Sequence, residues 1–569
     1  MSFKYKTTSF ASLLFLLNFI SSCGNQKKIN AYHFTTKKEI EVRRGAVVSA
    51  SPIASEVGVT ILKQGGNAID AAIATQLALA VVHPSAGNIG GGGFSIIHLK
   101  SGKNISIDFR EKAPAKASRD MYLDSNGNAQ MNLSQNSPLA VGVPGSVAGI
   151  FASMKYAKLP FKKLIQPAID LAEKGFVLVK GEAFSLNSAR NHLLNVNGFV
   201  PAYVKKTFWK EGDTLVQKDL ANTLKRIRDY GAEGFYAGET AKLIAEQMKK
   251  DNGLITEEDL KSYQAKEREP IIFDYRGKTV VSMPLPSSGG IILEQMLKMS
   301  AMENIDEMRY GTVASVQLMS EVERRAFADR AKYLGDQDFV KVPVKTLVSD
   351  AYLKKRMSDY DPHKAGNSRD TKEGYIIEGE ETTHFDVIDK DGNAVSVTTT
   401  LNGSYGTGIV VKGAGFLLNN EMDDFSVKPG VPNMFGAVGA EANAIAPGKR
   451  MLSSMTPTIV LKNNQPYIIV GTPGGTTIPT SVYQTIVDII DFKMTPKQAV
   501  DSPKFHQQWL PDVIFVEKDF NKNTIDSLEN MGYEITERES IGRTEVIKVE
   551  GNKFIAVADY RGEDGAAGY

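Results

Sequence analysis

Two runs of β-branched and aromatic residues flank a short turn in the last third of the chain, and together they predict a β-hairpin. The runs cover residues 382–388 and 394–402, and the five residues between them are rich in Asp, Gly and Asn. A turn centred on Asp391 gives the hairpin one apolar face. The same register brings the hydroxyl groups of Thr382 and Thr400 side by side at the open end of the hairpin.

Two interpretations fit this pair of threonines. A Thr–Thr pair across two strands is common in sheets and needs no function. A threonine hydroxyl is a poor nucleophile without a base, but its own α-amino group can act as that base once the preceding peptide bond is cut. An α-amine titrates near pH ~8, so much of it is neutral at physiological pH. The polar stretch 357–381 predicts an exposed loop, which would suit a cut before Thr382.

Composition limits the class of protein. The chain has 569 residues, of which 42% are hydrophobic and 23% charged, so a disordered or fibrous chain is excluded. The length fits several domains or one large layered domain. The formal charge is +2, and Lys4 and Lys6 near the N-terminus account for both charges. A body with a net charge near zero argues against nucleic-acid binding, which depends on neutralising phosphates.

The sequence lacks the common signatures of metal and nucleotide chemistry. A single cysteine, Cys23, excludes a disulfide framework and a cysteine-based metal site. The seven histidines are scattered, with no His-Glu-x-x-His motif, and there is no Gly-x-Ser-x-Gly elbow or dinucleotide-binding fingerprint. Asp423 and Asp424 are a candidate metal pair, but adjacent acids at the end of a strand more often point to opposite faces. We therefore expect neither a metal nor an organic cofactor.

The N-terminus predicts export. Residues 1–22 have the pattern of a signal peptide, with an apolar run, Phe10 to Ile20, that is too short for the ~20 residues of a membrane span. A small residue before Cys23 resembles the lipobox of bacterial lipoproteins, so we expect lipidation there; the alternative is an ordinary signal with an incidental cysteine. Residues 23–44 are interpreted as a polar tether. Gly24 in place of Asp favours, by resemblance, an outer-membrane lipoprotein that faces the periplasm or the cell surface.

The body divides into a helical part and a part rich in strands. Ala68–Val82 is apolar but contains Asp70, and it is predicted to be a buried helix capped by Asn67. The stretch 160–265 is predicted to be mainly helical. After residue 382 the pattern changes to strands separated by glycine turns.

Several longer motifs make the body, from about residue 45 to Tyr569, resemble the γ-glutamyltransferases (glutathione hydrolases) of the N-terminal-nucleophile class. The motifs are Leu62–Ala68, Gly90–Phe94, Asp108–Glu111, Gly142–Gly145, Thr382–His384, Leu418–Phe425, Leu452–Met455, Gly471–Gly475 and His506–Pro511. The resemblance implies an α/β fold, the four-layer αββα sandwich of that class. It also implies a precursor that cuts itself between Glu381 and Thr382. The resulting large chain (45–381, with the tether) and small chain (382–569) would stay together as a heterodimer.

The resemblance implies a role for each residue of the catalytic centre. Thr382 would be the nucleophile in both self-cleavage and turnover, and Thr400 would hydrogen-bond its hydroxyl. Gly474 and Gly475 would form the oxyanion hole, where backbone N–H groups face the developing charge. Without the resemblance, the two glycines would be interpreted as a plain turn after a strand.

The resemblance also implies a donor pocket for a glutamyl head group. Arg110 would bind the carboxylate, since a guanidinium fork matches that group, although alone it would be interpreted as a surface ion-pair residue. The other implied contacts are hydrogen bonds to the carboxylate from Ser453 and Ser454, and binding of the ammonium by Asp424 with Asn402 and Glu421.

Two positions depart from the family pattern. Glu421 stands where many bacterial relatives have Gln, which adds a negative charge near the ammonium. Phe435 stands where many relatives have a Tyr on a lid over the site, so the hydroxyl that could latch the lid is missing.

The activity implied is cleavage of the γ-glutamyl amide of glutathione and related compounds. The glutamyl group would pass to water or to an amine acceptor, in a balance that the sequence does not determine. One alternative is an acylase of the same superfamily, acting on β-lactam side chains or poly-γ-glutamate. A second is an uncut, non-catalytic lipoprotein that binds γ-glutamyl ligands. Against the first stands the retention of the donor-pocket residues Arg110, Asp424, Ser453 and Ser454. Against the second stands the retention of the catalytic residues Thr382, Thr400, Gly474 and Gly475.

Overall fold

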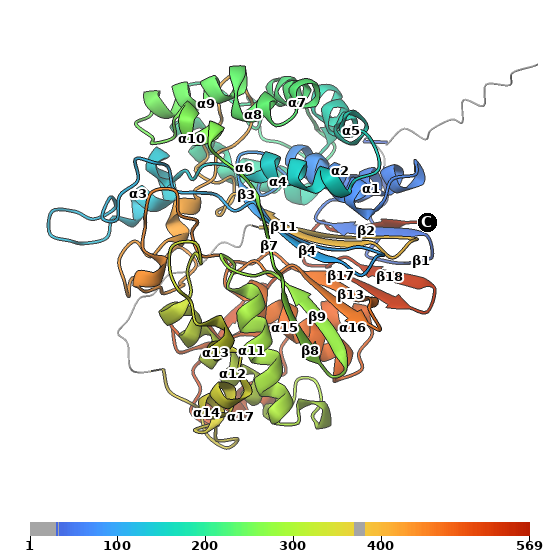
Figure 1. The fold of residues 1–569 in the computed structure, drawn as a ribbon, viewed down its shortest axis with the longest axis vertical. Coiled ribbons are helices and arrows are strands. Elements are labelled where there is room, and N and C mark those ends of the chain that lie inside the picture. The colour runs from blue at the N-terminus through green and yellow to red at the C-terminus, as the bar shows by residue number, and fades with distance from the viewer. Residues whose placement is uncertain (1–29, 32–33, 369–381) are drawn as a thin grey trace, which may run out of the picture.

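Two seven-stranded sheets lie face to face, and helices cover both outer faces (Figure 1). The structure is a computed structural model that describes residues 30–31, 34–368 and 382–569. The predicted signal peptide, Cys23 and Glu381 lie outside the described residues. The layers confirm the predicted αββα sandwich, in which each sheet has one face against the other sheet and one against helices.

The first sheet, here called the hairpin sheet, contains the predicted hairpin as β10 and β11, and all its neighbouring strands are antiparallel. In spatial order its strands are β19 (Gly565–Gly568), β2 (Gly45–Ser49), β10 (Thr383–Asp389), β11 (Ala394–Thr400), β3 (Gly92–His98), β4 (Asn104–Asp108) and β7 (Lys266–Arg268).

The second sheet, here called the outer sheet, is also antiparallel throughout. In spatial order its strands are β1 (Glu39–Val42), β18 (Lys553–Val557), β17 (Glu545–Glu550), β13 (Gln465–Gly471), β12 (Thr458–Lys462), β9 (Lys278–Ser282) and β8 (Ile271–Tyr275). Residues 39–42 belong to the predicted tether 23–44 but pair with β18, so the tether prediction is wrong for them. Both sheets therefore combine strands from before and after residue 382.

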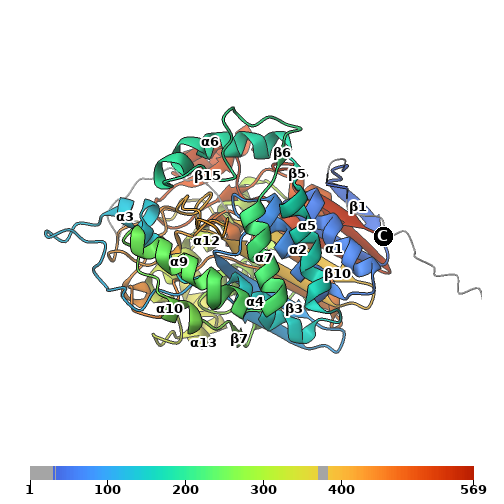
Figure 2. The same ribbon diagram turned by 90° about the horizontal axis from the view of Figure 1, so that it is seen from above.

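One helical layer packs on the hairpin sheet, and Figure 2 views the molecule from this side. Its central helix, α2, is buried along its whole length because it is apolar all round. As predicted, α2 covers Ala68–Val82 and Asn67 caps it, in a capping box with Asp70. The helices of this part are α1 (Pro52–Lys63), α2, α4 (Ser146–Ser153), α5 (Phe161–Lys174), α6 (Lys180–Val196), α7 (Lys218–Tyr230), α8 (Glu233–Tyr236), α9 (Gly238–Lys250) and α10 (Glu257–Lys261).

The other helical layer packs on the outer sheet. Its helices are α11 (Gly289–Met302), α12 (Val313–Tyr333), α13 (Val344–Leu347), α14 (Asp350–Met357), α15 (Thr477–Ile490), α16 (Pro496–Asp501) and α17 (Lys522–Asn530). The sequence pattern predicted strands after residue 382 and did not predict α15, whose residues are largely β-branched. Every residue of α15 is buried, so tertiary packing outweighs the weak β-preference of these side chains.

An apolar layer fills the space between the sheets, with side chains such as Phe94, Ile469 and Ile547. His384 lies in the same space and bonds Thr398 Oγ1 (2.9 Å) and Asp386 Oδ1 (3.0 Å) on its own sheet. Its ring lies so close to Gly471 of the outer sheet that a Cβ there would be 2.2 Å from Cε1. Glycine at this position therefore lets the two sheets approach where β10 passes β13.

Shorter elements complete the chain. One is the helix α3 (Met131–Asn136). Two small sheets consist of β5 (Phe176–Val177) and β6 (Thr214–Leu215), and of β14 (Phe505–His506), β15 (Ile514–Glu517) and β16 (Ile535–Arg538). The 3-10 turns are Pro138–Ala140, Met154–Tyr156, Ile305–Glu307, Glu421–Asp424 and Glu441–Asn443. Among the described residues, no helix combines the length and the apolar character needed to cross a bilayer.

Candidate active site

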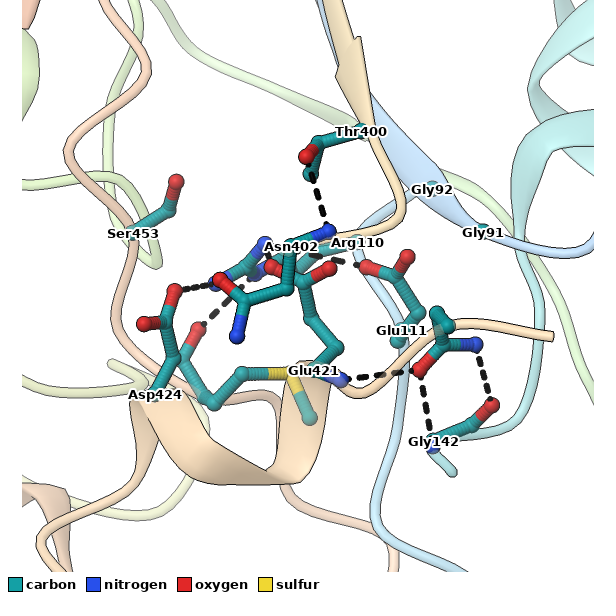
Figure 3. Close-up of polar contacts among 12 residues, drawn as sticks. Gly91, Gly92, Arg110, Glu111, Gly142, Thr400, Asn402, Glu421, Asp424 and Ser453 are labelled. Atoms are coloured by element: carbon teal, nitrogen blue, oxygen red, sulfur yellow. Dashed lines mark hydrogen bonds and ion pairs between the residues drawn. The ribbon is translucent and has the colours of Figure 1, made fainter. Parts of the chain in front are cut away.

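The hairpin holds the two threonines together, as the predicted register requires. Val387 pairs with Val395 and Phe385 with Val397. Thr382 directly precedes β10 and is 6% exposed. Its Oγ1 donates a long hydrogen bond of 3.5 Å to Thr400 Oγ1, at the end of β11. Thr400 Oγ1 also accepts a hydrogen bond of 2.8 Å from the N–H of Asn402, which fixes the position of this hydroxyl (Figure 3).

A pocket with an empty volume of about 330 Å³, including space open to solvent, lies beside the threonines. Every residue predicted for the catalytic centre and the donor pocket lines it except Gly474, which precedes the lining residue Gly475 in the chain. The predicted residues on its wall are Arg110, Thr382, Thr400, Asn402, Glu421, Asp424, Phe435, Ser453, Ser454 and Gly475. The structure thus brings together side chains that are up to 365 positions apart in the sequence, from Arg110 to Gly475.

Arg110 is fully buried and lies among acids (Figure 3). Its Nη1 contacts Glu421 Oε1 and its Nη2 contacts Asp424 Oδ2. Burial alone would lower the pKa of Arg110, but the charges of Glu421, Asp424 and Glu111 outweigh burial and raise it. In turn, burial raises the pKa of Glu421 and of Asp424, and Arg110 opposes that rise. The side chain predicted to bind a carboxylate and the acids predicted to bind an ammonium are therefore adjacent and paired with each other.

The turn from β13 to α15 carries the predicted oxyanion glycines. Gly474 has φ +133° and Gly475 φ +55°, both in the region that residues with a side chain rarely adopt. A Cβ on Gly475 would also lie 2.6 Å from Cδ1 of Phe435. Glycine is needed here for backbone conformation and for space, which brings this backbone to the wall of the pocket.

A family model described as gamma-glutamyltranspeptidase matches residues 54–569. The chain belongs to the gamma-glutamyltranspeptidase family. The chain is similar to the glutathione hydrolase proenzyme of Escherichia coli K12, with 47% identity over 543 residues that cover 93% of each chain. It is also similar to the glutathione hydrolase proenzyme of Pseudomonas aeruginosa, with 44% identity over 531 residues that cover 91% of this chain and 93% of the other. Membership confirms the predicted family and the prediction that the chain is an enzyme.

Solved structures agree with this assignment. Cephalosporin acylase from Bacillus halodurans has a TM-score of 0.82 at 27% identity, covering 94% of this chain and 98% of its own. Helicobacter pylori gamma-glutamyltranspeptidase has a TM-score of 0.55 at 45% identity, covering 61% of this chain and 99% of its own.

The loop predicted as a lid in this chain is held without a tyrosine hydroxyl. Phe435 is 5% exposed and its ring packs against Gly475. Asn433 Nδ2 donates to Asp424 Oδ1 (2.8 Å), and Gln508 Nε2 donates to the Phe435 carbonyl (3.4 Å). The loop is thus fixed by side chains that bond its backbone and its neighbour, and the missing hydroxyl does not leave it unattached.

Arg330, on the pocket wall, and Gln508, which bonds the loop that carries Phe435, are among the residues that were not predicted for the site. Arg330, on α12, lines the pocket and donates to Ser454 Oγ (3.1 Å) and Ser288 Oγ (3.1 Å), and burial lowers its pKa to about 10. Gln508 had been noted only as part of a family motif. Neither carries a local signal, because each reaches the site through packing between distant segments.

Asp423 and Asp424 differ from the sequence expectation in their backbone. They lie on a 3-10 turn, Glu421–Asp424, and not at the end of a strand. Their side chains nevertheless diverge, since Asp423 contacts Ser134 and accepts a hydrogen bond of 2.8 Å from Met434 N while Asp424 contacts Arg110. Within the described ranges, no group of three or more His, Cys, Asp or Glu side chains could hold a metal ion.

Proposed function

We propose that this chain is an autoprocessing γ-glutamyltransferase and glutathione hydrolase. It would cleave the γ-glutamyl amide of glutathione and related compounds through a threonine ester. The single observation that carries the proposal is the pocket in which Thr382 and Thr400 meet Arg110, Asp424 and Gly475. Those residues combine a nucleophile, two charges that complement a glutamyl head group, and a backbone turn suited to an oxyanion.

Self-cleavage is the first proposed step. The Thr382 hydroxyl attacks the carbonyl of Glu381, the C–N bond breaks, and the acyl group moves from nitrogen to oxygen. Water then hydrolyses the ester, which leaves a free α-amine on Thr382 and a carboxylate on Glu381. The position of Thr382 immediately before β10 supports this step, because the ladder with β11 begins only at Thr383.

Turnover uses the released amine as the base. The amine takes the proton of the Thr382 hydroxyl as its oxygen attacks the γ-carbonyl, and the leaving amine receives that proton. Backbone N–H groups of Gly474 and Gly475 stabilise the oxyanion, and removing such donors typically slows catalysis ~10²–10³-fold. The resulting ester is resolved by water or by an amino acid or peptide amine.

Substitution of Thr382 tests the proposal. We expect Thr382→Ala to remain one uncut chain without activity and Thr382→Ser to keep part of both processing and turnover. A denaturing gel, N-terminal sequencing of the small chain and hydrolysis of γ-glutamyl-p-nitroanilide provide the measurements. Normal two-chain processing of Thr382→Ala would refute the assignment, and so would a small chain that does not begin Thr-Thr-His-Phe.

An acylase is the second candidate, favoured by the similarity of the fold to cephalosporin acylase. A glutaryl side chain has no ammonium, so it would leave Asp424 and Glu421 without a cationic partner from the substrate. We therefore expect faster hydrolysis of γ-glutamyl-p-nitroanilide than of the matching glutaryl anilide. The opposite preference would favour the acylase.

For location, we propose that residues 1–22 are removed and that Cys23 is lipidated, anchoring the enzyme to the outer membrane. The support comes only from the signal pattern and the lipobox-like sequence. We expect the enzyme in the membrane fraction and Cys23→Ser in the soluble fraction. Equal distribution of both proteins would refute lipid anchoring.

A further inference from the structure

Glu111 is a fully buried acid directly beside the donor pocket. It follows Arg110 in the chain, and its Oε2 lies 3.8 Å from Arg110 Nη1 (Figure 3). Across the described part of the chain, neither oxygen of Glu111 has a hydrogen-bond partner. An ionised carboxylate in such a place is costly, because no hydrogen bond replaces those that it made to water and Arg110 compensates only from 3.8 Å.

The surroundings of Glu111 leave it little room to move. A Cβ on Gly92 would lie 2.6 Å from Glu111 Oε2, and one on Gly142 would lie 2.9 Å from Glu111 Cβ. Gly142 is tied to Asn419, which accepts from its N–H (2.9 Å) and donates to its carbonyl (2.8 Å). Asn419 Oδ1 also accepts from the N–H of Glu421 (3.0 Å), so the same asparagine fixes the segments on both sides.

The charges near Arg110 balance only if one acid stays neutral. Arg110 and Arg330 are the cations of the pocket, and Glu421, Asp424 and Glu111 are the nearby acids. Glu421 and Asp424 contact the guanidinium directly, whereas Glu111 has only the longer approach. Glu111 is therefore the acid that the geometry favours as the neutral one.

We propose that Glu111 is a positioning residue of the donor pocket. When Glu111 is protonated, the charge of Arg110 is available to the carboxylate of the donor, and when Glu111 is ionised, the donor binds more weakly. The inference rests on the proposed function, since it concerns the glutamyl head group. That head group is a zwitterion, so it fits a pocket whose own charges already balance. Ionised Glu111 would add one negative charge next to the guanidinium that binds the carboxylate.

The groups that face Glu111 place its titration near neutrality. Burial raises the pKa of Glu111 to about 7, opposed by Arg110 and assisted by Asp424 and Asp108. Asp108 is itself paired with Arg268 (2.7 Å) and with the buried Arg450 (3.3 Å). The nearby tyrosines Tyr236 and Tyr263 stay neutral because burial raises their pKa values. Burial, assisted by the charge of Glu111, also raises the pKa of the adjacent acid Glu421 well above its usual value, so the experiment must separate the two acids.

The test compares donor KM and kcat of the processed enzyme from about pH 5.5 to 8.5, with γ-glutamyl-p-nitroanilide as donor. We expect KM of the wild type to rise from about pH 7 upward, by about tenfold for each unit by which donor binding raises the pKa of Glu111. The variant Glu111→Gln should keep the low KM across this range. Titration of the Thr382 amine and of the donor amine is common to both proteins and cancels in the comparison.

Two further variants separate the alternatives. Glu545→Gln is the matched control. Glu545 is as buried as Glu111 and neither of its oxygens has a hydrogen-bond partner among the described residues, but it lies on β17 and not on the pocket wall. The KM profile of this variant should equal that of the wild type. Glu421→Gln should retain the step, moved to lower pH, since it removes a neighbouring negative charge. Loss of the step in Glu421→Gln but not in Glu111→Gln would overturn the proposal, as would identical profiles for Glu111→Gln and wild type.

A second measurement uses the wild type alone, in case Glu111→Gln does not mature. Calorimetric titration with L-glutamate at about pH 7.5, in two buffers of different ionisation enthalpy, counts the protons taken up on binding. We expect net uptake, because binding that is weakened by ionisation must favour the protonated form. Binding of glutamate without proton uptake would overturn the proposal. Failure of the wild type to cleave itself or to hydrolyse the donor would instead refute the proposed function.

Discussion

Removing Arg110 should destabilise the protein as well as the donor complex, because this guanidinium neutralises buried acids. Arg110→Met keeps an aliphatic side chain but leaves Glu421 and Asp424 buried without their cation. Breaking a buried pair in this way costs about 3–5 kcal/mol. With an unfolding entropy of about 2.1 cal/mol/K per residue, a chain of 569 residues should then lose about 2.5–4 °C in melting temperature.

The loss should depend on pH in a defined direction. Without Arg110, the native pKa values of Glu421 and Asp424 rise further above those of the unfolded chain, so the native state binds more protons. Such a state loses stability as pH increases from about 4 upward, and the variant should therefore be closer to wild type at about pH 5 than at about pH 8.

Thermal unfolding of the processed protein, followed by calorimetry, measures both effects. Arg119→Met is the matched control, because Arg119 pairs with Glu441 while 38% exposed, and such exposed pairs contribute only about 0–1 kcal/mol. The double variant Arg110→Met/Glu421→Gln should recover part of the lost stability but none of the donor affinity. If Arg110→Met melts no lower than Arg119→Met at pH 8, the electrostatic reasoning about this cluster is wrong.

Two further predictions concern the lid and the packing beneath it. Gln508→Leu removes the hydrogen bond from Gln508 to the Phe435 carbonyl and the one that Gln508 accepts from Thr476 Oγ1 (2.6 Å). The KM for the γ-glutamyl donor should therefore rise about fivefold, equivalent to about 1 kcal/mol. An unchanged KM in steady-state assays would exclude Gln508 from holding the lid. Burial lowers the pKa of His506 to about 3, so between about pH 6.5 and pH 3 the unfolded chain binds a proton that the native state does not. The melting temperature should therefore fall as pH drops through this range, and less steeply in His506→Gln than in the wild type. Parallel curves for the two proteins would contradict the burial argument.

The hairpin β10–β11 and the helix α2 could be predicted from the sequence, because residues close together in the chain determine both. The hairpin register follows from strict alternation around one turn, since a slip of one residue would bury its polar face against the helices. The helix α2 follows from an Asn cap and a continuous apolar run. By contrast, the β-branched α15 and the edge strand β1 depend on what packs against them, and the sequence pattern missed the helix and assigned the strand to a tether.

The site shows the same division. Thr382 and Thr400 could be paired from the sequence because one hairpin carries both. Arg110 and Gly475 could be assigned only through the family motifs, since nothing local indicates that they share a pocket. Arg330 was missed altogether, because the last turns of α12 reach the pocket by packing between layers.

The strand order explains how the two chains of a self-cleaving precursor could remain one folded unit after the cut. Before residue 382 the chain supplies β2 and β3, and after it β10 and β11, and these four strands are neighbours in the hairpin sheet. The proposed cut lies just outside the ladder, so it would break no hydrogen bond between β10 and its neighbours. Cleavage would therefore release an amine at the wall of the pocket while the sheets continue to hold both chains. The covalent break and the completion of the catalytic centre would then be the same event.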